Sequence, residues 1–313
     1  MSGRPAVVAL GGGHGLAASL RALRLVTDRI TAVVTVADDG GSSGRLREEF
    51  DVLPPGDLRM ALAALCDDTK WGLQWRDVLQ HRFAGTGELA GHSLGNLLIV
   101  SLWDLLGDTV GGLDLVGRLL NAHGRVLPMA SVPLEIEATV LGAEAGKGDR
   151  LSRVRGQVAV ATTEGRVVSI RLSPSKPPAC AEAVTAVREA DWVVLGPGSW
   201  FTSVMPHLMV PDLRDALLET RARRILTLNL LMHTGETHGF SAENHLEVLA
   251  AHAPDLRLDV VLADPTVVSD EALLRRVAAG MGAELWVSPV AVHDQPGHHD
   301  SLRLAAAYRD ILG

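Results

Sequence analysis

The first forty residues hold the pattern that most constrains the fold. Two short apolar runs, "AVVAL" (6–10) and "ITAVVTVA" (30–37), flank a glycine loop and a stretch with helical spacing of its apolar residues, 16–26. Both runs are rich in β-branched or small apolar residues, which is typical of buried strands. We therefore predict a β-α-β unit, the usual start of a doubly wound parallel sheet.

The rest of the chain continues this alternation of strands and helices, with one interruption. Helices are predicted at 54–66, with Asp57 as the N-cap, and at 91–106, and strands at 192–195, 224–231, 258–263 and 284–290. Between them, "LEIEATVL", "GQVAVAT" and "VVSIRL" alternate apolar and polar residues, as antiparallel strands do. We predict an α/β, Rossmann-like, mostly parallel sheet with an antiparallel β excursion near 130–173, in a single domain over 1–313.

Composition and charge narrow the functional classes. A hydrophobic content of 47% is ample for a large core, and a net charge of −8 disfavours general nucleic-acid binding. No apolar run approaches the ~18 residues that a membrane helix needs. Two cysteines far apart in the chain suit a reducing compartment. We expect a soluble cytoplasmic protein without nucleic-acid partners or membrane insertion.

The first glycine loop, 11–15, joins the first strand to the first helix. Glycines there let the backbone approach a phosphate, and the helix N-terminus supplies free N–H groups. The candidate contacts are Gly12, Gly13 and His14. The loop lacks the third glycine of a strict GxGxxG, because Leu16 takes its place. A tight turn with no ligand is the alternative reading.

A second loop, "DDGGSSGRLR" (38–47), follows the second strand. Asp38 and Asp39 can accept hydrogen bonds from sugar hydroxyls or hold a metal ion, and Ser42 and Ser43 can donate to an anion. Arg45 and Arg47 add positive charge. These groups together suit a phosphorylated sugar. A solvated loop with a surface Arg–Asp pair is the alternative.

A third loop, 196–199, follows the strand at 192–195. We expect Gly198 and Ser199 to meet the other loops at the carboxyl edge of the sheet, together with Asn229 and the "TGET" segment, 234–237. The sequence around Ser93 matches GxSxG, but no strand precedes it, so we interpret Ser93 as the start of a helix. No nucleophile–base pair stands out.

Taken in order, several segments resemble the YvcK-type gluconeogenesis factor family, whose wider superfamily includes the CofD-like 2-phospho-L-lactate transferases. The matching segments span residues 11 to about 250 and are "GGGHGL", "VTVADDGGSSGRLR", "PPGDLRMALAAL", "GHSLGNLL", "ADWVVLGPGSWFTSVMPHLMV" and "NLLMHTGETHGFSAENHLEVL".

The resemblance implies a cytoplasmic protein that binds a UDP-sugar such as UDP-N-acetylglucosamine. It also implies a role in cell shape and wall-precursor supply during gluconeogenic growth, with no established reaction or cofactor. A homodimer and a regulatory protein partner are left open. The ligand contacts that it implies are Gly12, Gly13, Asp38, Asp39, Ser42, Ser43, Asn96, Gly198, Ser199 and Asn229.

The chain departs from this family's usual pattern at four places. His14 replaces a threonine, Trp200-Phe201 replaces Leu-Tyr, "MHTGET" (232–237) replaces Thr-Gln-Pro-Gly-Glu-Thr, and His207 replaces an asparagine. These changes bear on the ligand more than on the fold.

Two hypotheses of function remain. The first is a regulator that binds a nucleotide sugar and catalyses no reaction. The second is a transferase of the 2-phospho-L-lactate type, in which Asp38, Asp39 and Asp57 hold Mg²⁺. The presence of a good diphosphate loop without an obvious nucleophile favours the first hypothesis.

Overall fold

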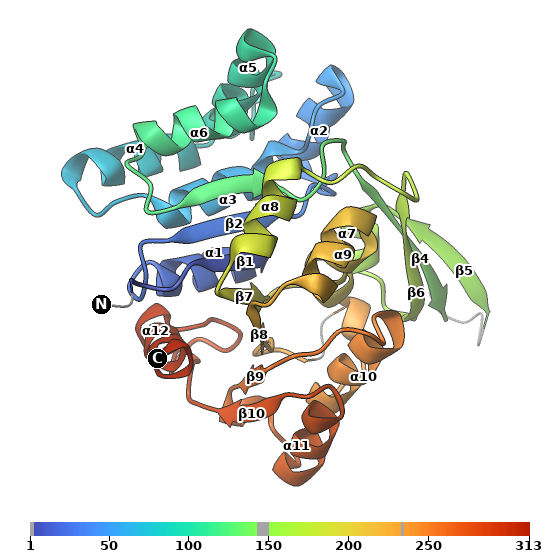
Figure 1. The fold of residues 1–313 in the computed structure, drawn as a ribbon. Coiled ribbons are helices and arrows are strands. Elements are labelled where there is room, and N and C mark those ends of the chain that lie inside the picture. Colours follow the sequence, from blue (N-terminus) through green and yellow to red (C-terminus); the bar gives the residue numbers. More distant parts are fainter. Residues whose placement is uncertain (1–2, 143–149, 233–234) are drawn as a thin grey trace.

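A seven-stranded parallel sheet forms the centre of the computed structural model, which describes residues 3–142, 150–232 and 235–313. The strand order is β10-β9-β8-β7-β1-β2-β3 (Figure 1), and each neighbouring pair is parallel. The strands are β1 (Val7–Gly11), β2 (Ile30–Val34), β3 (Arg125–Pro128), β7 (Trp192–Leu195), β8 (Arg223–Thr227), β9 (Val260–Ala263) and β10 (Glu284–Val287). The predicted α/β class with a mostly parallel sheet is confirmed.

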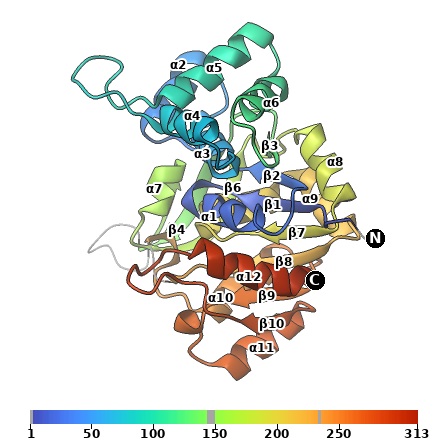
Figure 2. The same ribbon diagram turned by 90° about the vertical axis from the view of Figure 1, so that its left-hand side faces the viewer.

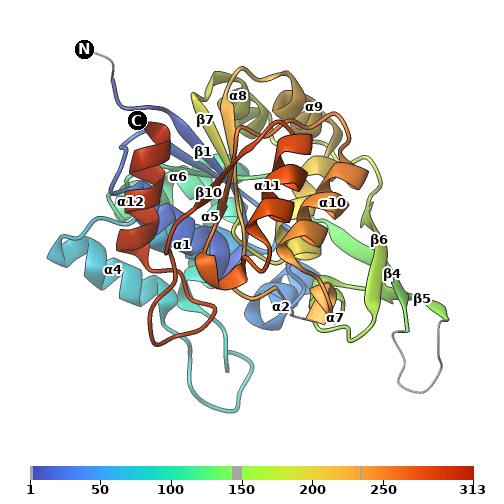
Figure 3. The same ribbon diagram turned by 90° about the horizontal axis from the view of Figure 1, so that it is seen from below.

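Helices cover both faces of this sheet. On one face, α1 packs against α3 and α12, and on the other α8 packs against α9 and α10 against α11 (Figures 2 and 3). The remaining helices of the amino-terminal half lie beyond the β3 end (Figure 1). The helices are α1 (Gly13–Leu23), α2 (Gly41–Phe50), α3 (Pro55–Leu65), α4 (Lys70–Gln80), α5 (Leu94–Leu106), α6 (Thr109–Leu119), α7 (Gln157–Ala161), α8 (Ala181–Glu189), α9 (Pro211–Glu219), α10 (Ala242–His252), α11 (Glu271–Gly280) and α12 (Ser301–Leu312).

The burial of the strands follows from their position. Every residue of β1, β7 and β9 is buried, because helices cover both faces of the central sheet. These strands accordingly consist of continuous apolar runs such as "WVVL". The strand β4 (Glu135–Leu141) instead alternates buried and partly buried residues, as expected of a strand with one covered face.

The antiparallel excursion is present, but its composition differs from the prediction. It is a three-stranded sheet in the order β5-β4-β6, with β5 at Leu151–Arg155 and β6 at Arg166–Ser173. The predicted strand "GQVAVAT" is wrong, because residues Gln157–Ala161 form the short helix α7. Gly156, at φ +98°, turns the chain there, and the carboxylate of Asp39 accepts a hydrogen bond from the N–H of Val158. A distant side chain thus stabilises a helix where local alternation indicated a strand.

Among the described residues, no helix combines the length and the apolar character required to cross a bilayer.

Candidate functional site

The direction of the strand order changes between β1 and β7. From β1 the chain proceeds to β2 and β3 on one side, and it later returns to β7 on the other side and continues outward to β10. Ligands of open α/β sheets bind at the carboxyl ends of the strands beside such a switch point. The glycine loops after β1 and β7 lie on the two sides of this point.

The first and third glycine loops are in contact. A Cβ atom added to Gly15 would overlap the carbonyl group of Pro197 and approach the Cα of Gly198 to 2.7 Å. A Cβ on Gly198 would in turn lie 3.8 Å from the carbonyl oxygen of Gly12. The missing side chains therefore allow two strand-end loops to share one edge of the sheet.

Side chains that follow β8 in the chain position the third loop. Asn229, just after β8, accepts a hydrogen bond from the N–H of Gly198 at 2.8 Å and donates to its carbonyl oxygen at 2.7 Å. The carboxylate of Glu236 accepts a hydrogen bond from the N–H of Phe201, at the start of the short π-helix Trp200–Val204. Thr35 donates to the carbonyl oxygens of Gly11 and Ser203.

Two carboxylates lie beside the first loop. A Cβ atom on Gly12 would lie 2.5 Å from Oδ2 of Asp57, and Asp57 accepts a hydrogen bond from the N–H of Gly13. A Cβ on Gly56 would lie 3.0 Å from Oδ2 of Asp38, which places the carboxylate of Asp38, from the loop after β2, beside the first turn of α3, where Asp57 lies. The prediction of Asp57 as the N-cap was wrong: α3 begins at Pro55, and Asp57 lies in its first turn.

These acids resist ionisation. Burial, followed by the charge of Asp38, raises the pKa of Asp57 to about 7. Burial also raises the pKa of Asp38, although hydrogen bonds from the Gly40 N–H and the Ser43 hydroxyl oppose the shift. A pair of desolvated like charges is costly, and a cation between them would relieve that cost.

The residues present fit Mg²⁺ only if the ligand completes its coordination. The described residues hold no cluster of three or more His, Cys, Asp or Glu side chains able to bind a metal. Asp38 and Asp57 supply two carboxylates, and Mg²⁺ commonly takes one or two carboxylates together with water and substrate phosphates. These two residues would hold the ion.

The second loop forms a buried hydrogen-bond network. The hydroxyl of Ser42 accepts hydrogen bonds from Asn96 Nδ2 at 3.1 Å and from the N–H of Ser93, and it bonds to His92 Nδ1. The hydroxyl of Ser43 accepts from the N–H of Gly56 at 2.9 Å. These serines and Asn96 are at most 3% exposed, so the structure gives them the role of fixing the loop against α3 and α5. Direct contact with a ligand stays a prediction.

Four other candidate residues are exposed, and their contacts lie in different parts of the protein. Asp39 is exposed and bonds to α7, and Arg45 donates to the carbonyl oxygen of Ala90 at 2.8 Å. His14 is exposed and lines a separate cavity between α1, α3 and α4. Ser199 is exposed, and its carbonyl oxygen accepts hydrogen bonds from the N–H groups of the last two residues of the π-helix.

The positions at which the chain departs from the family's usual pattern lie in different surroundings. Phe201 is buried and packs edge-on against Phe240, with ring centroids 6.0 Å apart. His207 is fully buried, its Nε2 bonds to the carbonyl oxygen of Val33 at 3.0 Å, and burial lowers its pKa to about 4. His207 is thus part of the core. The "TGET" segment and the departure at 232–234 include residues 233 and 234, which lie outside the described residues.

Two acids of this edge were not among the predicted ligand contacts, although the transferase hypothesis named Asp57 and the "TGET" segment, which contains Glu236, was expected at this edge. The carboxylate of Asp57 meets Gly12 only because α3 packs against α1, which is a contact between distant parts of the chain. The side chain of Glu236 is 2% exposed, and burial raises its pKa to about 7. In the sequence, Asp57 in "PPGD" and Glu236 in "TGET" each follow a glycine, and this pattern is the signal that could have identified them as site residues.

The GxSxG segment is structural. Ser93 precedes α5 (Leu94–Leu106), is fully buried, and donates its hydroxyl to the carbonyl oxygen of Leu79 at 2.8 Å. Its interpretation as the start of a helix is confirmed.

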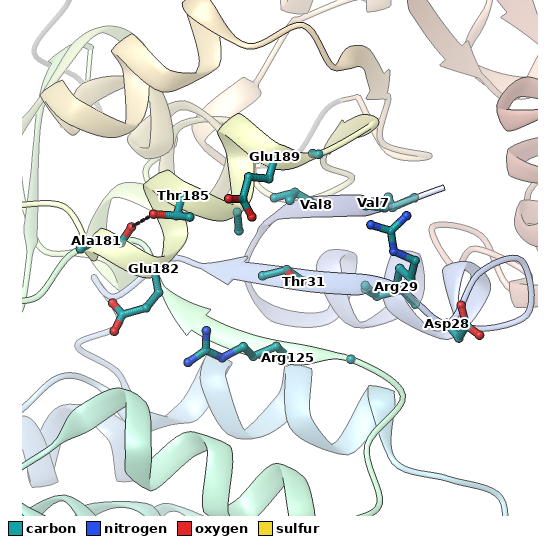
Figure 4. A pocket seen from close by; sticks show the side chains of 15 residues that line it. Val7, Val8, Asp28, Arg29, Thr31, Arg125, Ala181, Glu182, Thr185 and Glu189 are labelled. Carbon is teal, nitrogen blue, oxygen red and sulfur yellow. Dashed lines mark hydrogen bonds between the residues drawn. The ribbon is translucent and has the colours of Figure 1, made fainter. Parts of the chain in front are cut away.

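A cavity of about 720 Å³ lies at the opposite edge of the sheet, against the amino-terminal ends of β1, β2 and β3 and helix α8 (Figure 4). Its charged side chains are of both signs, among them Arg29, Arg125, Glu182 and Glu189. Arg125 forms two hydrogen bonds with Asp114, and Arg29 pairs with Asp191 at 3.6 Å. Because the two arginines of this cavity are paired with acids and the glycine loops are at the other end of the strands, we place the candidate site at the carboxyl edge.

Comparison with known proteins shows the family and the fold of this chain. The family model described as 2-phospho-L-lactate transferase CofD matches residues 7–300. A putative gluconeogenesis factor from Mycobacterium tuberculosis is 56% identical over 306 residues, covering 96% of this chain and 88% of the relative. The gluconeogenesis factor of Bacillus subtilis is 36% identical over 87% of this chain and 82% of its own length. A crystal structure of a UPF0052-family protein from Bacillus halodurans superposes with a TM-score of 0.86 at 31% identity, covering 98% of this chain and 99% of that chain.

Proposed function

This chain belongs to the gluconeogenesis factor family, within the larger CofD family, and we propose that it binds a nucleotide-diphosphate sugar at the carboxyl edge of its sheet. The observation that carries the proposal is the contact of the loops after β1 and β7 at the switch point, beside Asp38 and Asp57. Backbone N–H groups of such loops bind phosphates.

The chemistry of the edge suits a diphosphate with an attached sugar. The N–H groups at the start of α1 favour the diphosphate, since the helix N-terminus carries partial positive charge. The carboxylate of Asp38 can accept sugar hydroxyls or share Mg²⁺ with Asp57. The family resemblance of the sequence implies UDP-N-acetylglucosamine, and we propose it ahead of other nucleotide sugars.

We further propose a regulatory role in the cytoplasm, which links the supply of this sugar nucleotide to cell-wall synthesis and cell shape during gluconeogenic growth. This role rests on the family resemblance. Three serines of the carboxyl edge, Ser42, Ser43 and Ser93, are buried and hydrogen-bonded within the protein, which favours a binding function over nucleophilic catalysis by these three groups.

A thermal-shift measurement tests the binding proposal. UDP-N-acetylglucosamine at 100-fold above its Kd should add about 2.7 kcal/mol of stability, whereas NAD should leave Tm unchanged. Asp57→Asn should reduce the UDP-sugar shift, and Asp310→Asn, at an exposed position of α12, should retain it. No shift with any UDP-sugar at millimolar concentration would contradict the proposal.

A second function, a Mg²⁺-dependent transferase, is favoured by one observation: the raised pKa values of the neighbouring Asp38 and Asp57, which indicate a place for a cation. Native mass spectrometry of the purified protein separates the two functions. A retained deazaflavin precursor, or binding that requires Mg²⁺, would support the transferase, while a retained nucleotide sugar supports the first proposal.

A further inference from the structure

A second cavity, of about 490 Å³, lies between α1, α3 and α4. Arginines from four segments of the chain line it, and Asp68 is the one acidic residue among the described residues of its wall. The arginines are Arg21, Arg24, Arg59, Arg76 and Arg82. Such a concentration of positive charge is unexpected in a chain whose net charge is −8.

Part of this positive charge has no acidic partner among the described residues. Arg24 pairs with Asp68 and also donates to the carbonyl oxygen of Cys66. Arg76 pairs with the exposed Asp77, its neighbour in sequence. Arg21 is exposed and forms neither a hydrogen bond nor an ion pair with any described residue. The cavity therefore presents guanidinium donors that are free to bind an anion.

Arg59 provides an independent indication of a ligand. Its side chain is 4% exposed, its Nε donates to Oδ1 of Asn96 at 2.8 Å, and its Nη1 has no hydrogen-bond partner within the part of the chain that the structure describes. A buried, charged donor without an acceptor is costly, so such groups are normally paired in native proteins. An anion in the cavity would reduce this cost.

The arginines also destabilise one another. Burial, followed by the charge of Arg82, lowers the pKa of Arg59 to about 10, although the charges of Asp57 and Asp38 oppose the shift. Burial, followed by the charges of Arg24 and Arg76, lowers the pKa of Arg21. Like charges gathered in a partly desolvated space are unfavourable without a counter-charge.

We propose that this cavity is a second ligand site, separate from the carboxyl-edge site, and that it takes a small molecule carrying two or more phosphate groups. Guanidinium groups present planar forks of N–H donors that match phosphate oxygens, and arginine is the usual residue for such recognition. The volume lies within the range of small-molecule pockets. The site goes beyond the proposed function, which concerns the glycine loops.

Arg59 lies between the two sites. It lines the arginine cavity, while its Nε holds Asn96, which in turn donates to Ser42 in the second loop. His14, in the first turn of α1, also lines the cavity. Because the two sites share this wall, the experiment must distinguish a second site from an extension of the first.

Isothermal titration with inorganic tripolyphosphate, at constant ionic strength, tests the proposal. The variant Arg21→Gln/Arg76→Gln removes two charges from the wall. Neither change should cost a core contact, because within the described ranges Arg21 has no hydrogen-bond or ion-pair partner and Arg76 bonds to the exposed Asp77. Arg275→Gln/Arg276→Gln, at exposed positions of α11, is the matched control for net charge.

We expect the cavity variant to weaken tripolyphosphate binding at least tenfold and to leave UDP-N-acetylglucosamine affinity unchanged, while the control variant changes neither. Equal tripolyphosphate affinity in the two double variants would overturn the proposal. It would also be overturned if UDP-N-acetylglucosamine displaced tripolyphosphate and lost affinity in the cavity variant, because the cavity would then be part of the first site. Tripolyphosphate binding that depends on Arg21 and Arg76 in a protein that binds no UDP-sugar would support this inference and contradict only the first function.

Discussion

The two edges of the parallel sheet hold their charges in opposite ways. At the amino edge, Arg125 and Arg29 are matched with nearby acids, and the cavity there carries both signs of charge (Figure 4). At the carboxyl edge, Asp57, Asp38 and Glu236 are desolvated, and the pKa of each is raised. The arginines at the amino edge are thus neutralised by nearby acids, whereas the buried acids at the carboxyl edge would be stabilised by a proton, a cation or a ligand.

This difference is informative because cavity volume alone does not identify the candidate site. The cavity at the amino edge is larger than the arginine cavity, about 720 Å³ against 490 Å³, yet Arg29 and Arg125 in it have acidic partners. Unsatisfied or strongly perturbed ionisable groups are a better sign of a functional site than volume. The predictions below test this distinction.

The largest expected effect is on the contact between the two glycine loops. Gly15→Ala places a Cβ against the backbone of Pro197 and Gly198, which no side-chain movement can relieve. We expect the free energy of unfolding to fall by more than about 3 kcal/mol, as severe overpacking does. Urea denaturation would measure the loss.

Gly280→Ala is the matched control for this change, because a Cβ there, at the end of α11, meets nothing within 4 Å. Its stability should stay within about 1 kcal/mol of the parent protein. If Gly15→Ala were as stable as Gly280→Ala, the two loops would not be in the contact that defines the site.

The next effect is the pH dependence produced by Glu236. Burial raises its pKa from 4.5 to about 7, so the folded protein holds this proton more tightly than the unfolded chain does. The resulting stability is fully present below pH 4.5 and is lost as the pH rises through 7. The difference between these two pKa values corresponds to at most about 3 kcal/mol in the free energy of unfolding.

Glu236→Gln removes this titration and keeps an acceptor for the N–H of Phe201. Its Tm should therefore exceed that of the parent protein at pH 8 by several degrees, and the two should converge near pH 4. Glu88→Gln, at an exposed position, should follow the parent protein throughout. Parallel pH profiles for Glu236→Gln and the parent protein would show that Glu236 is not held protonated.

The sequence predicted the carboxyl edge better than it predicted the contacts within it. The loops after β1, β2 and β7 were predicted because apolar, largely β-branched runs followed by glycine-containing loops are local features of the chain. The meeting of Asp57 with Gly12, and the gathering of arginines from four segments, depend on how α3 packs against α1 and α4, and no local pattern reports such packing.

The helix at 157–161 shows the same limit in secondary structure. The residues "QVAVA" alternate in polarity and favour a strand, yet the turn at Gly156 and the hydrogen bond from Val158 to Asp39 produce a helix. Asp39 lies more than a hundred residues earlier in the chain. A tertiary contact has therefore overridden the local preference.

A smaller effect follows from this role of Asp39. Asp39→Ala removes the acceptor for the Val158 N–H and should cost about 1 kcal/mol, the usual value of a lost helix cap. Asp39→Asn keeps an oxygen acceptor and should cost less. Thermal unfolding of both variants checks this order, and a loss of UDP-sugar affinity without a loss of stability in Asp39→Ala would instead assign Asp39 to the ligand.

The smallest effect should come from the amino edge, where the charges are already matched. Asp114→Asn breaks the ion pair with Arg125. The side chain of Asp114 is 28% exposed and that of Arg125 is 43% exposed. Exposed ion pairs contribute about 0.2–1 kcal/mol, so the free energy of unfolding should change by no more than this, and less at high salt. UDP-sugar binding should be unaffected, because the pair lies at the opposite end of the strands from the glycine loops. A loss of ligand affinity in Asp114→Asn comparable to that in Asp57→Asn would reverse the assignment of the two edges, since it would show that compensated charges at the amino edge also serve binding.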